Sequence, residues 1–209
     1  MTIRLNLSSC KVKEKIKSGF SESSWTPHQK GYTISHGYEW LMGSPPTHQW
    51  TKLVWNDWNV PKHSFNSWPI MQGGLNTKDK LFSYGCCEDD LCILCAEQPE
   101  TKEHLFAECK FSCQVQKYVE EWIKRPFPTD NEMLRVLDSS VNWKALTMVL
   151  SCYKYTVWHQ RNLARTQFSI VRPVLVAEQM KIVVQQQIRK FYDSRGKHQQ
   201  LNARDWTRF

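Results

Sequence analysis

The sequence predicts a mainly α-helical protein with short helices in its first two thirds and a long antiparallel helical pair after them. Apolar residues recur at helical spacing in several segments, whereas alternating runs of Val, Ile or Thr are nearly absent. The chain has 209 residues, 41% of them hydrophobic and 23% charged. This composition is ordinary for a globular chain, and the length allows one sizeable core or a small domain with an appendage.

Two polar or proline-bearing joints divide the chain into three segments. Residues 1–30 are expected to form a connector helix and a linker that ends in "SESSWTPHQKG". Residues 31–125 are expected to form a domain of short helices. Residues 126–209 follow the joint "KRPFPTD" and are expected to be a basic helical region with a frayed tail.

The short helices are predicted from caps and breakers. Ser35 is a plausible N-cap for a helix that ends at Gly43, and the next segment places Trp50 and two aliphatic residues on one face. Pro61 marks a helix start, the position where proline does least harm. Pro69 lies inside that helix and predicts a kink or an early end. Thr77 is expected to cap one more short helix.

The C-terminal helices are predicted from their apolar spacing. A short helix is expected at 131–140. In 142–167 the apolar residues are spaced three and four apart, which is a coiled-coil type of seam: Trp143, Leu146, Leu150, Tyr153 and Val157. The segment 172–194 places four more apolar residues on one side: Val176, Met180, Val183 and Phe191. The two long helices are expected to pack as an antiparallel pair.

Positive charge is concentrated in the last third of the chain. The net charge is +8, and residues 142–209 carry 12 Lys and Arg against 3 Asp and Glu. Residues 1–141 are close to neutral. A basic region of this kind is typical of a partner with negative charge.

The eight cysteines favour metal binding over disulfides. The N-terminus has no apolar segment of the signal-peptide type, and no run approaches the length of a membrane span. We therefore expect an intracellular protein, nuclear or cytoplasmic and not secreted, with no membrane partner. In that compartment close-set Cys and His residues more often bind metal than form disulfides.

One cluster has the spacing of zinc ligands: Cys92 and Cys95, then His104, then Cys109. A Cys-x-x-Cys turn brings two sulfurs together, and Thr101 can cap a helix that carries the other two ligands. Four protein ligands leave no position for water, so one structural Zn²⁺ is predicted, with the short helices around it. Nearby cysteines could substitute as ligands, Cys113 first and then Cys86 or Cys87.

Several stretches resemble the reverse-transcriptase zinc-binding domain of plant LINE-type non-LTR retrotransposon polyproteins. They are "YTISHGYEWLMG", "WTKLVWNDWNVPKHSFNSWPIMQGGLNTKDKL", "CILC" and "ETKEHLFAECKFS", and the resemblance runs from about residue 32 to 122. It implies the same four zinc ligands and a module that helps the polymerase engage RNA or target DNA. It also implies that the chain is a detached C-terminal piece of such a polyprotein.

No catalytic constellation is visible. A polymerase Tyr-x-Asp-Asp motif is absent, and "YGCCEDD" places its acidic pair too far from Tyr84. Neither an endonuclease nor an RNase H carboxylate set can be assembled. Cys86 or Cys87 has no general base in view. The protein is therefore expected not to be an enzyme and to have no small-molecule substrate.

The basic C-terminal helices are the predicted nucleic-acid surface. The zinc loop itself is acidic, with seven Asp and Glu against one Lys in 88–109, so it would repel phosphate. The predicted contacts are Lys154, Arg161, Arg165, Arg172, Lys181, Arg189 and Lys190. A weaker second patch consists of Lys52, Lys62, His63, Lys78 and Lys80.

Tryptophans crowd the first part of the chain. Four are expected to lie in the core because of their helical spacing: Trp40, Trp50, Trp55 and Trp68. Trp58 lies near a turn and is the candidate for an exposed ring that could stack on bases.

Two functions compete. The first is a zinc-stabilised, retrotransposon-derived accessory domain that binds RNA or DNA with low sequence selectivity through its basic helices. The alternative is a protein-interaction module whose exposed apolar faces dock on a polymerase or self-associate. A steep loss of affinity with salt would favour the first.

Overall fold

The computed structural model describes residues 48–136, 141–167 and 170–194, and the account below concerns this part of the chain. The predicted connector at 1–30 and the helix predicted at 35–43 lie outside it. The described residues are helical, and their only extended pairing is the bridge between Leu91 and Pro99. The mainly α class is confirmed.

Three short helices come first: α3 (Thr51–Val54), α4 (Pro61–Met71) and α5 (Lys78–Ser83). α4 begins at Pro61 as predicted, and it ends two residues after Pro69. Its end is closed by a hydrogen bond of 2.7 Å from the Gly74 N–H to the Pro69 carbonyl. Thr77 stands at the N-cap of α5 with extended backbone, although its side chain makes no capping bond.

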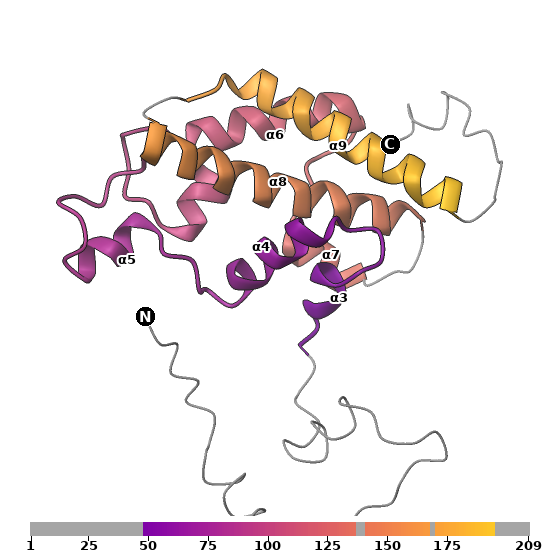
Figure 1. The fold of residues 1–209 in the computed structure, drawn as a ribbon, viewed down its shortest axis with the longest axis horizontal. Coiled ribbons are helices and arrows are strands. Elements are labelled where there is room, and N and C mark those ends of the chain that lie inside the picture. The colour runs from indigo at the N-terminus through magenta and orange to yellow at the C-terminus, as the bar shows by residue number, and fades with distance from the viewer. Residues whose placement is uncertain (1–47, 137–140, 168–169, 195–209) are drawn as a thin grey trace, which may run out of the picture. The chain divides into compact units, whose positions relative to one another are not determined.

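A single π-helical turn, η2 (His104–Glu108), leads into α6 (Lys110–Ile123). The short α7 (Asp130–Val136) follows, then the two long helices α8 (Val141–Gln167) and α9 (Pro173–Ser194). In Figure 1, α9 lies beside α8 and returns along it, and α6 packs against α9 as well. The C-terminal part is therefore a three-helix layer, not an isolated pair.

The main hydrophobic core joins the Cys/His-rich loop to the C-terminal helices. Leu94 from the loop, Leu105 from η2, Val115 and Val119 from α6, and buried residues of α8 and α9 form one cluster. All five predicted seam residues of α8 are buried. The core therefore continues across residue 125, where the sequence suggests a joint.

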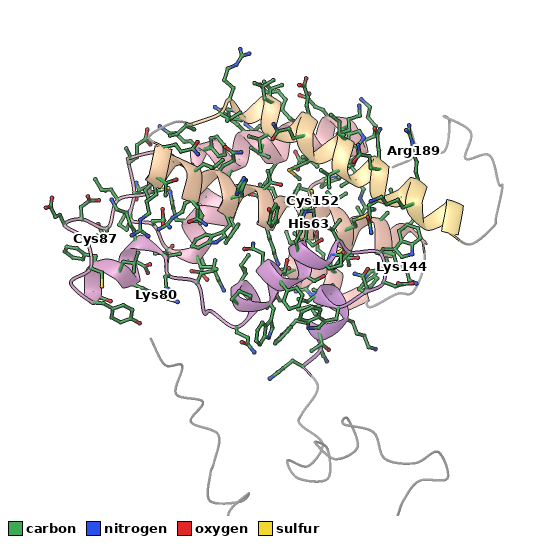
Figure 2. All side chains as sticks on the ribbon, in the orientation of Figure 1. His63, Lys80, Cys87, Lys144, Cys152 and Arg189 are labelled. Carbon is green, nitrogen blue, oxygen red and sulfur yellow. The ribbon has the colours of Figure 1, made fainter. Side chains whose placement is uncertain are left out.

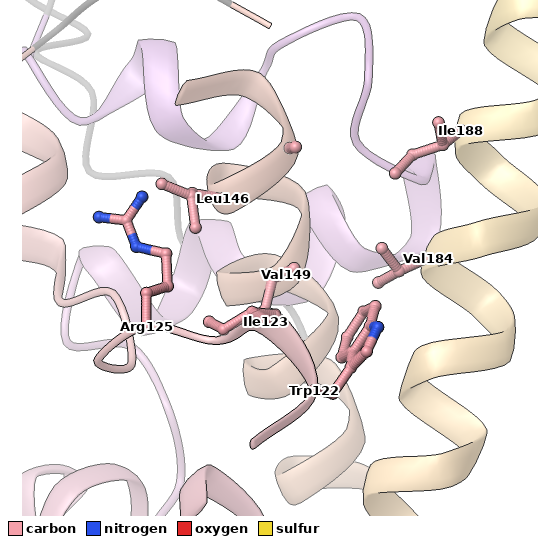
Figure 3. Close-up of a pocket in the computed structure, with 8 residues that line it drawn as sticks. Trp122, Ile123, Arg125, Leu146, Val149, Val184 and Ile188 are labelled. Carbon is pink, nitrogen blue, oxygen red and sulfur yellow. The ribbon is translucent and has the colours of Figure 1, made fainter. Parts of the chain in front are cut away.

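The three long helices meet around a small apolar cavity of about 20 Å³. Figure 3 shows the Trp122 ring of α6 pointing toward Val184 of α9, with Val149 of α8 between the helices. A second, smaller cluster joins α3, α7 and α8 through Leu53, Met133, Trp143, Leu146 and Leu150.

Tryptophan burial contradicts the prediction at Trp55, Trp58 and Trp68, whereas Trp50, expected in the core, is half-buried. Trp58 is only 3% exposed, whereas Trp55 and Trp68 are 47% and 44% exposed. α3 has one turn, so Leu53 and Val54 occupy its inner side and Trp55 falls outside. Trp40 lies outside the described residues. None of the described helices is long and apolar enough to cross a membrane.

Candidate metal centre

The first two candidate ligands lie on a tight turn between Leu91 and Pro99, the two residues of the isolated bridge. The Cys92 N–H donates to the Gln98 carbonyl at 2.8 Å, and the Ala96 N–H donates to the Cys92 carbonyl at 2.7 Å. Ala96 takes a left-handed conformation with φ of +56°, which turns the chain back after Cys95. Both sulfurs are thereby held on one side of the turn.

The other two ligands are brought together by η2. The Cys109 N–H donates to the carbonyl of His104, five residues earlier, at 2.7 Å. In an α-helix, residues five apart would point about 140° away from each other. The wider π turn places them on the same side. Thr101 starts this segment as predicted, since its Oγ1 accepts a hydrogen bond of 3.0 Å from the His104 N–H.

The four side chains converge on one point. Their ligand atoms all lie within 4.8 Å of one another. The sulfurs of Cys92 and Cys109 are 3.9 Å apart, and the Cys95 sulfur is 3.3 Å from His104 Nε2. Sulfurs bound tetrahedrally to zinc are about 3.8 Å apart, so the set fits one zinc ion. Because all four positions come from the protein, such a zinc ion is structural.

The centre stabilises the thiolate that a metal needs. A hydrogen bond from Cys92 and, after it, the backbone N–H groups of Ser112 and Phe111 lower the pKa of Cys109, although burial opposes them, while the same contact and burial raise the pKa of Cys92. Cys109 is the N-cap of α6, where the N–H groups of the first turn point at its sulfur. Three buried or half-buried sulfurs and one imidazole complete a set of soft ligands.

The alternative cysteine ligands stay outside the cluster. The Cys113 sulfur lies 3.3 Å from the Ala107 carbonyl, and burial raises the pKa of this thiol. The Cys87 sulfur lies 3.2 Å from the Asp89 carbonyl, at the α5 end in Figure 2. Cys86 is exposed. The first choice of four ligands is therefore the one that the geometry supports.

Glu100 connects this centre to the long helix α8. Its Oε1 accepts hydrogen bonds from Arg161 Nε at 2.9 Å, Arg161 Nη2 at 2.6 Å and the Lys78 N–H at 3.0 Å. Its Oε2 accepts one of 3.4 Å from the N–H of Ile93, inside the Cys-x-x-Cys turn. Both charged side chains are fully buried. No local sequence pattern predicts this buried pair, because a count of charges treats every Arg and Glu as exposed to solvent.

The π turn is also fixed to α8. The Phe106 carbonyl accepts hydrogen bonds from Tyr153 Oη at 2.7 Å and from Gln116 Nε2 at 2.9 Å. A π turn leaves carbonyls without their usual helical partners, and these two side chains supply donors. The zinc ligands on η2 therefore depend on α8 for their position.

Two of the seven predicted nucleic-acid contacts are wrong. Arg161 is buried against Glu100, and Lys154 is buried with an ion pair to Asp130. Burial lowers the pKa of Lys154, and Asp130 partly restores it. Neither side chain can reach a phosphate. The other five are exposed, and Figure 2 shows Arg189 projecting from α9: Arg165, Arg172, Lys181, Arg189 and Lys190.

The weaker second patch also changes. His63 is buried between α4 and α8, with its ring 4.6 Å from that of Tyr155. It cannot serve as a surface contact. Lys52 and Lys62 are exposed, whereas Lys78 pairs with Asp89.

The comparison with protein families agrees with the geometry. The family described as zinc-binding in reverse transcriptase matches residues 32–115, which include all four ligands. No curated protein and no solved structure matches the chain. The matched family is a zinc-binding domain and not the polymerase domain itself. Residues 32–115 are therefore a reverse-transcriptase zinc-binding domain, whose zinc site is formed by Cys92, Cys95, His104 and Cys109.

Proposed function

We propose that this chain is a retrotransposon-derived accessory domain of the plant LINE type that binds RNA or DNA with low sequence selectivity. Zinc stabilises the fold, and the exposed cations on α9 and at the end of α8 contact phosphates. The observation that carries the proposal is the charge of this surface. Five exposed cations follow Arg161 in the described part, and the sequence of α9 holds only two acids, Glu178 and Asp193.

The acidic zinc loop supports separate roles for the zinc module and the basic helices. Asp89, Glu97, Glu103 and Glu108 are exposed around the metal centre. Lysines pair with the first three, but acids outnumber Lys seven to one in 88–109, so that face disfavours a polyanion. The cations on α9 face solvent instead. The zinc module acts as a scaffold that holds α8 and α9, because it shares their core and the Arg161–Glu100 pair.

The test uses the zinc-loaded full chain and a triple variant, Lys181→Gln, Arg189→Gln and Lys190→Gln. Labelled duplex DNA and single-stranded RNA are titrated at about 50 and 200 mM salt. The wild type is expected to lose affinity steeply with salt, and the variant to bind more weakly with a shallower slope. A matched triple variant of exposed glutamates, Glu97→Gln, Glu103→Gln and Glu108→Gln, should bind at least as well. Equal binding by wild type and basic variant would refute the proposal.

A protein-interaction role is the second candidate, and a separate observation favours it. Ile170, Leu175 and Ile182 are 48%, 38% and 53% exposed, and the last two lie seven residues apart on α9. Such spacing forms an apolar stripe that a second helix could cover. Sedimentation of the wild type and a Leu175→Glu, Ile182→Glu variant would reveal self-association through it.

The proposed role is non-catalytic and intracellular, in the nucleus or the cytoplasm. The seven cysteines of the described part are all free thiols, as a reducing compartment would keep them. Three of them, Cys92, Cys95 and Cys109, belong to the zinc site beside His104, and they bind metal as thiolates only when they are not oxidised.

A further inference from the structure

Three aromatic side chains of the α3–α4 region stand in solvent and have no part in the metal centre. Trp55, Phe65 and Trp68 are 47%, 64% and 44% exposed. The rings of Trp55 and Phe65 meet edge to face, with centroids 5.4 Å apart and planes at 81°. Phe65 and Trp68 lie three residues apart on α4 and share one face of it. These three residues are called the aromatic patch below.

Packing of the core does not need these rings. The inner side of the same segment is filled by Leu53, Val54, Trp58 and Ile70, each at most 5% exposed. Large aromatic side chains that remain exposed in a group are typical of a binding surface.

The patch stands on a fixed corner of the backbone. Asn59 is buried, and its Nδ2 donates to the Leu53 and Val54 carbonyls at 2.8 and 3.1 Å. Its Oδ1 accepts a hydrogen bond of 3.2 Å from Ser151 of α8. The end of α3 and the turn into α4 are thereby tied to the long helix, so the rings are positioned before any ligand arrives.

Positive charge surrounds the patch. Lys52 lies three residues before Trp55, and Lys62 lies three residues before Phe65. Both lysines are exposed, and neither forms an ion pair with a described residue; Lys62 Nζ lies over the Tyr155 ring of α8, 4.9 Å from its centroid. The nearby Asp57 lies 3.4 Å from Lys144, which balances its charge. The patch therefore combines flat aromatic faces with unbalanced cations.

We propose that the aromatic patch binds unpaired nucleic-acid bases, and that Lys52 and Lys62 contact the adjoining phosphates. Every base can stack on an aromatic ring, and lysines attract the backbone of either RNA or DNA. In a duplex the base faces are already stacked on one another, so the patch selects single strands. The inference rests on the proposed function, to which it adds a site separate from α9.

The experiment compares the zinc-loaded full chain with its Trp55→Ala and Trp68→Ala variants. The probes are a labelled oligothymidylate of about 15 nucleotides, an oligouridylate of the same length and a matching DNA duplex. Each substitution is expected to weaken single-strand binding about 5- to 100-fold, the loss of one stacked base. Duplex affinity should not change.

Three further variants serve as controls. Tyr118→Ala removes a ring of α6 that is 40% exposed and should leave binding unchanged. Trp68→Tyr keeps an aromatic face and should restore most of the affinity. Lys62→Gln should make the dependence of single-strand affinity on salt shallower, by the amount expected for the loss of about one phosphate contact. Thermal melting of each variant verifies the fold.

The outcomes separate the two proposals. If the wild type binds neither single strands nor duplex, the proposed function and this inference both fail. If it binds and the two tryptophan variants bind equally well, only the inference fails. The inference also fails if the tryptophan variants lose as much affinity for duplex as for single strands. It fails too if they change self-association without changing nucleic-acid binding.

Discussion

Arg161 and Glu100 form a fully buried ion pair that joins the C-terminal part of α8 to the loop of the zinc site. Two guanidinium nitrogens lie 2.9 and 2.6 Å from one carboxylate oxygen. The Trp158 ring lies 4.8 Å from the same guanidinium. A charge in this position is tolerated only because its partner is also buried. The pair therefore makes the C-terminal helices part of the metal centre's framework.

Removing the Arg161 cation should lower the stability of the domain. Arg161→Ala leaves Glu100 buried without a counter-charge, and we expect a loss of about 3–5 kcal/mol in the free energy of unfolding. Denaturant titration of the zinc-loaded chain measures this loss. Zinc affinity, measured by competition with a chromophoric chelator, should also fall, because Glu100 accepts the Ile93 N–H inside the ligand turn.

Arg165→Ala is the matched control, since Arg165 is exposed one turn later on α8. It should change stability by less than about 0.5 kcal/mol. The double variant Arg161→Ala, Glu100→Ala should cost less than the sum of its single variants. A small effect of Arg161→Ala, equal to that of Arg165→Ala, would mean that the pair does not support the site.

Zinc removal should disrupt more than the ligand loop. His104→Ala or excess chelator is expected to reduce the helical circular dichroism of 75–122, as the sequence predicts. η2 also packs against α8 and α6 against α9, so the loss should extend to those helices. Binding energies of about 10–16 kcal/mol in small zinc peptides show the scale of the coupling.

Cys113→Ala supplies the comparison, because Cys113 lies beside the site without joining the cluster. It should keep its zinc and its melting temperature. An unchanged melting curve after chelation, with zinc loss verified by elemental analysis, would show that the metal is not structural.

Acid should destabilise the fold through His63. Burial, with a smaller contribution from Lys62, lowers the pKa of His63 from 6.5 to about 4. The folded state keeps the ring neutral while the unfolded chain takes up a proton below 6.5. Stability is therefore complete above pH 6.5 and falls between 6.5 and 4, at most by about 1.4 kcal/mol per pH unit.

Zinc binding also weakens in acid, so the measurement compares the wild type with His63→Phe. Phenylalanine keeps a ring against Tyr155, and His63 Nδ1 has no hydrogen-bond partner within the described part of the chain. The difference in unfolding free energy between the two proteins should grow from pH 7 to 5 in favour of the variant. A difference in unfolding free energy that stays constant with pH would show that groups other than His63 cause the acid sensitivity.

Lys124→Gly should stabilise the chain. Lys124 is exposed and ends α6 in the left-handed conformation, with φ of +55°. That conformation costs a side-chain-bearing residue about 1–2 kcal/mol, and the extra freedom of unfolded glycine offsets about half of the gain. We expect an increase of about 0.5–1 kcal/mol by denaturant titration. Lys117→Gly, within α6, should instead destabilise it.

Patterns within a few residues of the chain predicted the local structure well. Pro61 starts α4, Thr101 caps the turn before η2, and the seam of α8 faces the core. The four zinc ligands lie within 18 residues, so their spacing alone brings them together. Each of these features depends on backbone geometry that neighbouring residues determine.

Features that depend on distant residues could not be predicted in this way. A buried arginine is indistinguishable in sequence from a solvated one until its partner is known, which explains the error at Arg161. Trp55 and Trp58 lie on one turn and a bend, where no periodicity decides which ring faces α8. The π turn is likewise visible only through the carbonyl contacts made by Tyr153.

Glu100 and Arg161 are 61 residues apart along the chain, and this separation determines which part of the zinc site can form first. During synthesis all four zinc ligands emerge before α8 exists. A zinc ion captured at that stage would lie in a loop whose central carboxylate has no counter-charge and whose π turn has no donor from Tyr153. Maturation of the site must therefore wait for the last third of the chain. A chain shortened to residue 141 would hold all four zinc ligands in an unfinished domain.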